Sequence, residues 1–329
     1  MKTLPLLSLL LVALAVGPLR ADPPAPPKAT VAELNALGFG PTIAADAKVI
    51  KLHGGFGFTE GATADKNGDL FFVDQDNNRI HKWSVADQTL SIFLEPSHRS
   101  NGQYFDAKGN LIACCDERNE LWSIAPDGSH TVLISYAGFE GHPLDGPNDV
   151  WVRPDGGLYV TDPCYSRTWW DPKVARPAQP VHSVYYLSPD RKKLIRVAGA
   201  AEKFDQPNGL VGTPDGKTLY VADLSGDTTW AYDIQPDGTL ANGRLISHHG
   251  SDGMTVDTQG YLYQTPNYEG ATGVTIFDTK TGKVVGFVPV PEQPANLAFA
   301  GKDHSTLYLC ARTSLYMIQT KAKGANAAK

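Results

Sequence analysis

Cysteine is scarce in this 329-residue chain, and the few present are not arranged for metal binding. No pair has the CxxC spacing that is typical of zinc sites. Two of the cysteines are adjacent and would point to opposite sides of a strand, which argues against a disulfide between them. We therefore expect small, buried core residues at Cys114, Cys115, Cys164 and Cys310.

An excess of positive charge is also missing. Lys and Arg number 29 against 35 Asp and Glu, a net charge of -6. Without a basic stripe, nucleic acid is not an expected partner. A GxSxG motif is absent too, and no Ser-His-Asp order appears, which disfavours a serine hydrolase. Hydrophobic residues make up 42% of the chain and charged residues 19%, so a disordered protein is excluded.

Long apolar runs are absent except at the N-terminus. There, Lys2 precedes an apolar stretch over 6–16 and a small-residue site that ends at Ala21. This pattern is typical of a secretory signal peptide rather than a membrane span. We expect a signal peptide at 1–21, a flexible proline-rich leader at 22–40, and a secreted or periplasmic mature chain without a membrane span.

What the sequence does contain is a repeat. Six segments share a polar turn, usually with Gly, followed by Leu and an apolar run rich in β-formers. The separations between successive leucines are 41, 47, 61, 43 and 45 residues. A period in the forties with strand-like content indicates propeller blades rather than helical repeats. The anchoring leucines are Leu70, Leu111, Leu158, Leu219, Leu262 and Leu307.

Each period accommodates four strands, which predicts an all-β fold: a six-bladed β-propeller over 41–320, followed by a disordered tail at 321–329. The last repeat has room for only three strands before this tail. We expect its outer strand to come from the N-terminus, at 45–51, which would close the ring and remove two open edges.

Counting back ten or eleven residues from each leucine leads to an oxygen-bearing side chain in every repeat. This position opens the innermost strand of each blade, where six chains converge on the central channel. Six such groups would be costly to bury without a cation among them. The alternative is that they cap the inner strands by bonding turn amides. The six residues are Glu60, Asn101, Asn148, Asn208, Asp252 and Asn296.

The ligand type indicates the class of metal. Carboxylate and amide oxygens without His or Cys suit a hard cation. We expect one divalent cation, Ca²⁺ first, with Mg²⁺, Mn²⁺ or Zn²⁺ as alternatives. Glu60 and Asp252 would supply two negative charges to balance it.

At these residues the sequence resembles the senescence-marker-protein/gluconolactonase family, which includes regucalcin-like sugar lactonases. The resemblance covers roughly 40–320. It implies a six-bladed propeller with a divalent metal at the top of its channel, bound at the positions of Glu60, Asn148, Asn208 and Asp252, with Asn101 contacting substrate or lining the same ring. It depends on GFGFTEGATAD (55–65), SNGQYFDAKGNL (100–111), GPNDVWVRPDGGLYVTDPCY (146–165), QPNGLVGTPDGKTLYVAD (206–223) and SDGMTVDTQGYLY (251–263).

Hydrolysis at such a metal needs a base. Asp252 is the first candidate because a carboxylate beside the metal can take a proton from an adjacent water. Asp149, next to Asn148, is the competing candidate, with a strand cap as its alternative role.

The substrate wall is expected in the long segment 163–180, which follows a second strand and so lies on the metal face. Its aromatic and cationic side chains would contact a sugar-like substrate, together with the ring amides Asn101 and Asn296. Alternatively, the tryptophans only pin the segment to the blade. The predicted contacts in the segment are Tyr165, Arg167 and Trp169.

These features predict a secreted, metal-dependent hydrolase that opens a sugar lactone, a small-molecule substrate. Two alternatives stay open: a metal-dependent esterase or phosphotriesterase with the same site, and a non-catalytic propeller that binds carbohydrate or protein at its top face. The sequence does not decide the oligomeric state.

Overall fold

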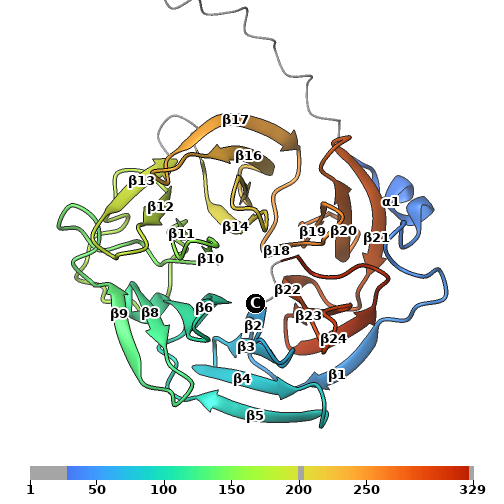
Figure 1. The fold of residues 1–329 in the computed structure, drawn as a ribbon, viewed down its shortest axis with the longest axis horizontal. Helices are drawn as coiled ribbons and strands as arrows, with labels where there is room; N and C mark the ends of the chain where they lie inside the picture. Colours follow the sequence, from blue (N-terminus) through green and yellow to red (C-terminus); the bar gives the residue numbers. More distant parts are fainter. Residues whose placement is uncertain (1–27, 199–203, 326–329) are drawn as a thin grey trace, which may run out of the picture.

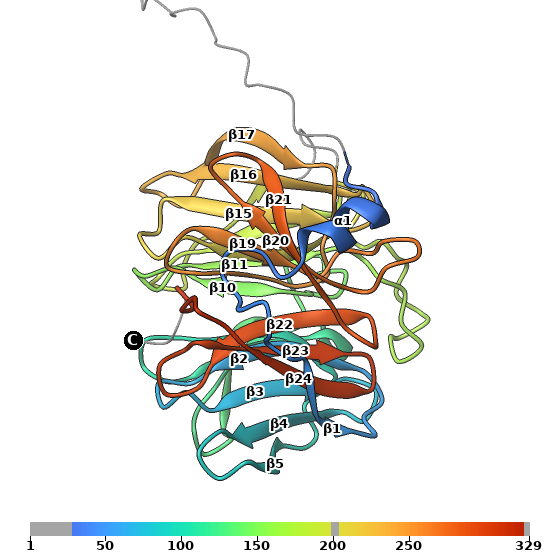
Figure 2. The ribbon, with the colours of Figure 1, turned by 90° about the vertical axis from the view of Figure 1, so that its right-hand side faces the viewer.

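The computed structural model describes residues 28–198 and 204–325. Within them, 24 strands form six four-stranded antiparallel sheets around a central axis (Figure 1). Viewed from the side, the blades stack around this axis as a thick disc (Figure 2). The predicted six-bladed, all-β propeller is therefore confirmed.

Five blades each use four consecutive strands, ordered from the axis outward. Blade 1 contains β2 (Thr59–Ala64), β3 (Leu70–Asp74), β4 (Arg79–Ser84) and β5 (Thr89–Leu94). Blade 2 contains β6 (Ser100–Phe105), β7 (Leu111–Cys115), β8 (Glu120–Ile124) and β9 (His130–Ile134), with a 3-10 turn η1 (Asp116–Arg118) after β7. Blade 3 contains β10 (Val150–Val152), β11 (Leu158–Asp162), β12 (Ser183–Leu187) and β13 (Leu194–Ala198). Blade 4 contains β14 (Pro207–Gly212), β15 (Thr218–Asp223), β16 (Thr228–Ile234) and β17 (Leu240–Ser247). Blade 5 contains β18 (Met254–Val256), β19 (Tyr261–Gln264), β20 (Gly273–Asp278) and β21 (Lys283–Pro289).

Blade 6 is closed by the N-terminal part of the chain. It combines β22 (Pro294–Ala300), β23 (Thr306–Ala311) and β24 (Ser314–Gln319) with the outer strand β1 (Ile50–Gly54). Closure by an N-terminal strand is as predicted, but the strand begins at Ile50 rather than at residue 45. The preceding residues have other partners: the Ile43 side chain is buried between blades, and the Thr42 carbonyl accepts the backbone N–H of Lys321 at 2.8 Å.

A short helix, α1 (Val31–Leu37), forms where a flexible leader was expected. Thr30 and Glu33 form a capping box, in which each side chain accepts the backbone N–H of the other residue. Leu34 is fully buried, and α1 lies against β21 (Figure 1). The leader prediction is thus wrong for 31–37, while the predicted signal peptide at 1–21 lies outside the described residues. Among the described residues, no helix has the length and apolar character needed to cross a membrane.

The core lies between the blades. Every residue of the second strands β3, β7 and β11 is buried, because each sheet is covered by a neighbouring blade on both faces. All six anchoring leucines are at most 1% exposed, which explains their recurrence at one position per repeat. Three cysteines also lie in this core as predicted, whereas Cys164 is only half-buried; none of the four forms a disulfide within the described chain.

The C-terminal residues 321–325 are ordered against the propeller, contrary to the tail expected at 321–329. Ala322 is 1% exposed, and Gly324 forms a bridge with Asp257 just after β18. The backbone N–H of Ala325 donates to the Val256 carbonyl at 3.0 Å. Gly324 and Ala325 therefore lie at the end of the inner strand β18, the end opposite Asp252. Residues 326–329 lie outside the described residues.

Candidate functional site

The ring positions predicted from the repeat lie at irregularities of the inner strands. In four blades the inner ladder shifts register at this point, between Glu60 and Thr63, Ser100 and Gln103, Pro207 and Leu210, and Pro294 and Asn296. In blades 3 and 5 the ring residues Asn148 and Asp252 precede the strand itself. Such bulges re-aim a side chain away from the pleat, which explains how these positions can turn toward the axis.

Neighbouring ring positions come into close contact through the glycines that follow them. A β-carbon at Gly61 would lie 2.1 Å from the Asn101 carbonyl oxygen, and φ at Gly61 is +58°. Only glycine fits such an approach without strain. A β-carbon at three other ring glycines would lie 2.5–2.8 Å from the next blade, in the pairs Gly102 with the Asn148 carbonyl, Gly209 with the Asp252 carbonyl and Gly253 with Asn296.

Two carboxylates and an amide lie together at the ring. Glu60 is 2% exposed, and the charge of Asp252 acts on its carboxyl group. The Asn208 amide nitrogen donates to Asp252 Oδ1 at 2.9 Å and to the Tyr165 hydroxyl at 3.0 Å. Because both N–H groups of Asn208 have these partners, its amide oxygen turns away from them. Three of the four predicted ligands, and one predicted substrate contact, are thus brought together.

The remaining ring amides have different environments. Asn148 is 5% exposed, and its backbone carbonyl accepts the Gly102 N–H at 2.7 Å. The side-chain oxygen of Asn296 accepts the Leu297 N–H at 2.8 Å. Asn101 is 3% exposed, and its side-chain oxygen has no hydrogen-bond partner among the described residues.

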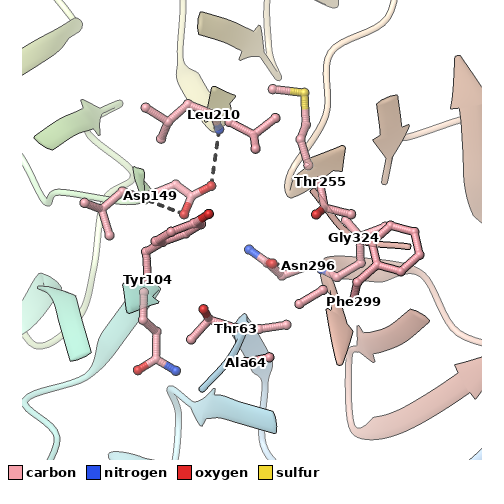
Figure 3. A pocket seen from close by; sticks show the side chains of 16 residues that line it. Thr63, Ala64, Tyr104, Asp149, Leu210, Thr255, Asn296, Phe299 and Gly324 are labelled. Atoms are coloured by element: carbon pink, nitrogen blue, oxygen red, sulfur yellow. Dashed lines mark hydrogen bonds between the residues drawn. The ribbon is translucent and has the colours of Figure 1, made fainter. Parts of the chain in front are cut away.

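Asp149 lies inside the channel. Its carboxylate accepts the Val150 N–H at 2.9 Å and the Leu210 N–H at 3.2 Å (Figure 3). It lines a cavity of about 40 Å³, enough for ordered water. Thr63, Tyr104 and Asn296 line the same cavity, and the C-terminal Gly324 reaches it from the other end (Figure 3).

Burial dominates the electrostatics of these acids. Desolvation, followed by the charge of Asp252, raises the pKa of Glu60 well above its ordinary value. Desolvation raises the pKa of Asp252 to about 6, against the opposing effects of Asn208, Glu60 and Arg167. Desolvation also raises the pKa of Asp149 to about 7, although its backbone hydrogen bonds lower it. These shifts mean that ionising all three acids together is costly without a compensating cation.

The predicted wall, segment 163–180, does reach the ring. Tyr165 contacts Asn208, and the Arg167 guanidinium lies 5.7 Å from the Tyr165 ring centre. Trp170 is 8% exposed and donates its indole N–H to Asp116 Oδ1 at 2.6 Å. Trp170 therefore attaches the segment to blade 2, which is the alternative role predicted for the tryptophans.

Trp169 has a different environment from Trp170. It is half-buried, with the guanidinium of Arg99 4.5 Å and that of Arg167 5.4 Å from its ring.

Sequence reasoning missed the specific partners of the acids that end the second strands. Asp74 accepts the Gly57 N–H at 3.0 Å, Asp162 accepts the Asp145 N–H at 3.0 Å, and Asp223 accepts the Gln206 N–H at 2.8 Å. Each acid thereby fixes the loop that leads into the ring position of its own blade. In the sequence, these three acids share one recognisable feature: each ends the apolar second strand of its blade.

The residues at the ring fit a hard cation. The donor set is oxygen-only, two of its members are buried carboxylates, and Asn101 directs an unpartnered oxygen into the protein. No group of three His, Cys, Asp or Glu side chains within the described ranges is arranged to hold a metal. The candidate set differs from such a group because it combines two carboxylates with amides.

Comparison with known proteins identifies the lineage of this site. Residues 58–313 match the family model described as the SMP-30/gluconolactonase/LRE-like region, which covers every ring position. The chain belongs to the SMP-30/gluconolactonase/LRE-like family. The predicted family is thus confirmed, and with it the class of lactonase-type hydrolases that act on ester bonds.

Two enzymes are among the proteins with similar sequences. The Zymomonas mobilis gluconolactonase is 27% identical over 296 residues, which cover 81% of this chain and 80% of that protein. The Loligo vulgaris diisopropyl-fluorophosphatase is 26% identical over 265 residues, which cover 73% of this chain and 81% of that protein.

Solved structures agree with this fold. A Xanthomonas campestris gluconolactonase superimposes with a TM-score of 0.74 at 28% identity, covering 92% of this chain and 99% of that chain. A calcium-binding regucalcin from Agrobacterium tumefaciens has a TM-score of 0.68 at 18% identity, covering 86% of this chain and 98% of that chain, and it supports the fold alone.

Proposed function

We propose that this protein hydrolyses a sugar lactone at the ring formed by Glu60, Asn148, Asn208 and Asp252, with a divalent cation held by these four residues. Ca²⁺ is the preferred ion, ahead of Mg²⁺, Mn²⁺ and Zn²⁺, because the donors are all oxygens. The observation that carries the proposal is the direct contact of Asn208 with Asp252, beside the buried Glu60. The gluconolactonase relatives support the substrate class.

The cation, when bound, supplies Lewis-acid polarisation of the ester carbonyl. Asp252 accepts the proton of the attacking water, because a carboxylate beside the cation lies within reach of an adjacent water. The hydrogen bond from Asn208 fixes the orientation of this carboxylate.

Asp149 is the weaker candidate for the base. Backbone N–H groups of Val150 and Leu210 bind its two oxygens, and these contacts keep the carboxylate inside the channel. We therefore assign proton transfer to Asp252.

The segment 163–180 provides one wall for the substrate. Tyr165 presents a hydroxyl that already accepts a hydrogen bond from Asn208, so its own proton can be donated to a substrate oxygen. Arg167 and the half-buried Trp169 add a cation and an aromatic face, a combination that suits a hydroxylated ring. Asn101 and Asn296 complete the proposed substrate-binding set.

A second candidate is a metal-dependent esterase or phosphotriesterase that uses the same ring. The similarity to the Loligo vulgaris diisopropyl-fluorophosphatase favours it, because that name describes an enzyme acting on a phosphofluoridate. An acid beside a cation is suited to attack on either carbonyl or phosphoryl centres.

Turnover assays with three substrate types separate these candidates. We expect hydrolysis of gluconolactone to exceed that of aryl esters and diisopropyl fluorophosphate, to stop in EDTA and to return with Ca²⁺. Glu60→Gln and Asp252→Asn should abolish turnover, whereas Asp87→Asn, in the exposed turn between β4 and β5, should not. Carbohydrate binding without turnover of any substrate would instead support a non-catalytic propeller.

We also propose that the protein is exported, on the strength of the 1–21 sequence alone. Mass spectrometry of the N-terminus in the secreted or periplasmic fraction tests this. A mature chain that begins near residue 22 is expected, and an intact Met1 in the cytoplasm would contradict export.

A further inference from the structure

Asp116 occupies the same place in blade 2 as Asp74, Asp162 and Asp223 in their blades, yet its carboxylate has different partners. The other three bind backbone N–H groups that lead into their own ring positions. Asp116 instead accepts side-chain donors: Gln75 Nε2 at 3.3 Å, Arg167 Nε at 2.9 Å and the Trp170 indole N–H at 2.6 Å.

Arg167 and Trp170 both belong to segment 163–180, which connects β11 to β12 in blade 3. Asp116 is 2% exposed, so the contact is buried, and it links two blades across 51 residues of sequence. A buried ion pair that is also hydrogen-bonded holds its members in one geometry. Asp116 therefore holds Arg167 through one atom of its guanidinium, Nε. The Arg167 side chain is still 23% exposed.

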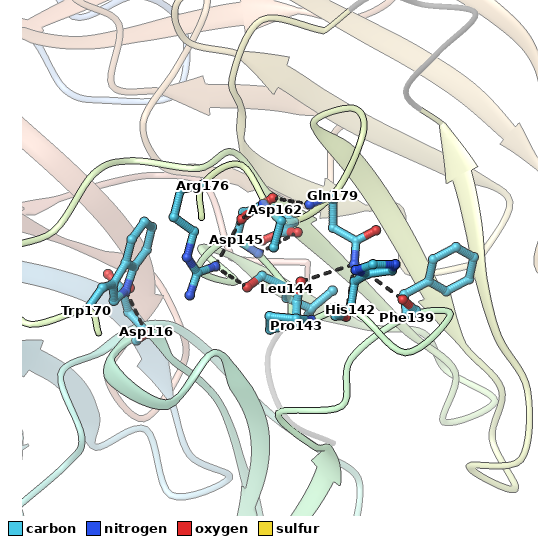
Figure 4. Close-up of polar contacts among 11 residues, drawn as sticks. Asp116, Phe139, His142, Pro143, Leu144, Asp145, Asp162, Trp170, Arg176 and Gln179 are labelled. Atoms are coloured by element: carbon cyan, nitrogen blue, oxygen red, sulfur yellow. Dashed lines mark hydrogen bonds and ion pairs between the residues drawn. The ribbon is translucent and has the colours of Figure 1, made fainter. Parts of the chain in front are cut away.

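A second clamp fixes the far end of the segment. Arg176 Nη1 donates to Asp145 Oδ1 at 3.0 Å, and its guanidinium lies 4.5 Å from the Trp170 ring (Figure 4). The same carboxylate accepts the backbone N–H groups of Ala178 and Gln179 at 2.6 and 2.8 Å. The segment is thus held at both ends by a buried aspartate bound to an arginine, and its geometry is set before any substrate arrives.

Arg167 is also connected to the ring residues, through Tyr165. Its guanidinium packs by the Tyr165 ring, and the Tyr165 hydroxyl bonds Asn208, which bonds Asp252. Only Nε of Arg167 is bound to Asp116; its two terminal nitrogens donate to no residue in the part of the chain that the structure describes.

We propose that Arg167 is the residue that selects hydroxylated lactones, through hydrogen bonds from its terminal nitrogens to a ring hydroxyl, and that Asp116 is the positioning residue that aims it. This inference depends on the proposed lactonase function. The charge of Arg167 is already balanced by Asp116, so a neutral hydroxyl is the better partner.

The test compares glucono-δ-lactone with δ-valerolactone, which has the same ring without hydroxyl groups. Arg167→Gln should lower kcat/KM for gluconolactone by about tenfold, mainly through KM, because a hydrogen bond from a charged donor is lost. The value for δ-valerolactone should change by less than about twofold, since that substrate makes no such bond. Arg79→Gln is the matched control, because Arg79 forms an exposed ion pair with Glu95 on blade 1.

Asp116 is tested through its effect on Arg167. Asp116→Asn should reduce the preference for gluconolactone, and it should add nothing in the Arg167→Gln background, because it acts through that residue. Arg167→Lys should lose the preference as fully as Arg167→Gln, since a lysine cannot bind Asp116 and the substrate in a fork geometry. This variant tests positioning even if Asp116→Asn fails to fold.

Several results would overturn the inference. Equal losses on both lactones in Arg167→Gln would show a purely structural role for the segment. Additive effects in the double variant, or full preference in Arg167→Lys, would exclude positioning by Asp116. Absence of hydrolysis of either lactone by the wild-type protein would overturn the proposed function together with this inference.

Discussion

Without the proposed divalent cation, the stability of this protein should fall as the pH rises. Burial raises the pKa of Asp252 from 3.8 to about 6 and moves the pKa of Glu60 in the same direction. The cation-free folded chain therefore binds protons more tightly than the unfolded chain. The resulting stabilisation is complete below the unfolded pKa values, near pH 4, and is lost as the pH passes through the raised folded values.

The size of this effect follows from the shift of one residue. For Asp252, a rise from 3.8 to about 6 corresponds to at most about 3 kcal/mol, since one pKa unit is worth about 1.4 kcal/mol. In a chain of this size, about 3 kcal/mol displaces Tm by roughly 4–5 °C, because the entropy of unfolding is about 2.1 cal/mol/K per residue. Glu60 adds to the loss in the same direction. A bound cation should restore the stability, because it favours the ionised carboxylates.

Differential scanning fluorimetry from about pH 4.5 to pH 8, on chelator-dialysed protein with and without saturating CaCl₂, measures this effect. Tm should fall with pH in the chelated sample and stay nearly level in Ca²⁺. Glu60→Gln should flatten the chelated profile and remove most of the response to Ca²⁺, whereas Asp87→Asn, in an exposed turn, should behave as wild type. A chelated Tm that is constant or rises through pH 7, with no response to Ca²⁺, would refute the cation ring.

Three further predictions concern single residues. Asp252→Asn should lower kcat by at least about 10²-fold, as expected for loss of a general base. The Tm of the chelated protein should rise or stay unchanged. Near-normal turnover would exclude Asp252 as the base. Tyr165→Phe, which removes the hydroxyl bound to Asn208, should raise KM for gluconolactone several-fold without changing Tm by more than about 2 °C, and an unchanged KM would separate Tyr165 from the substrate. Gly61→Ala should lower the free energy of unfolding, measured in urea, by more than about 2 kcal/mol. The new β-carbon would lie 2.1 Å from the Asn101 carbonyl oxygen, at a residue whose φ is +58°. An unfolding midpoint equal to that of the wild type would mean that the ring is wider than described.

The repeat made much of this architecture predictable. Each blade places its second-strand leucine and its ring residue at a nearly constant separation, so spacing alone located Glu60, Asn208 and Asp252 before any coordinates. The strand boundaries were also predictable, because polar turns separate the apolar runs in every repeat. Both signals are local, confined to a single blade.

What the sequence could not predict involves contacts between blades or departures from the regular ladder. The inner-strand bulges that aim Glu60 at the axis leave no distinct pattern beyond the glycine that follows. Strand β1 begins later than predicted, because Ile43 and Thr42 find partners elsewhere in the fold. The pairing of Asp116 with Arg167 joins residues from different repeats, so no periodicity relates them.

The position of the C-terminal residues also limits how small molecules can reach the cavity beside Asp149. Gly324 borders the same cavity as Asp149, and Ala325 is bonded to the end of β18 beside it. Because Gly324 lines one side of this cavity, we expect the proposed substrate to approach the ring from the Glu60 end of the axis. A substrate bound there would then block the exchange of water in the cavity until the product leaves.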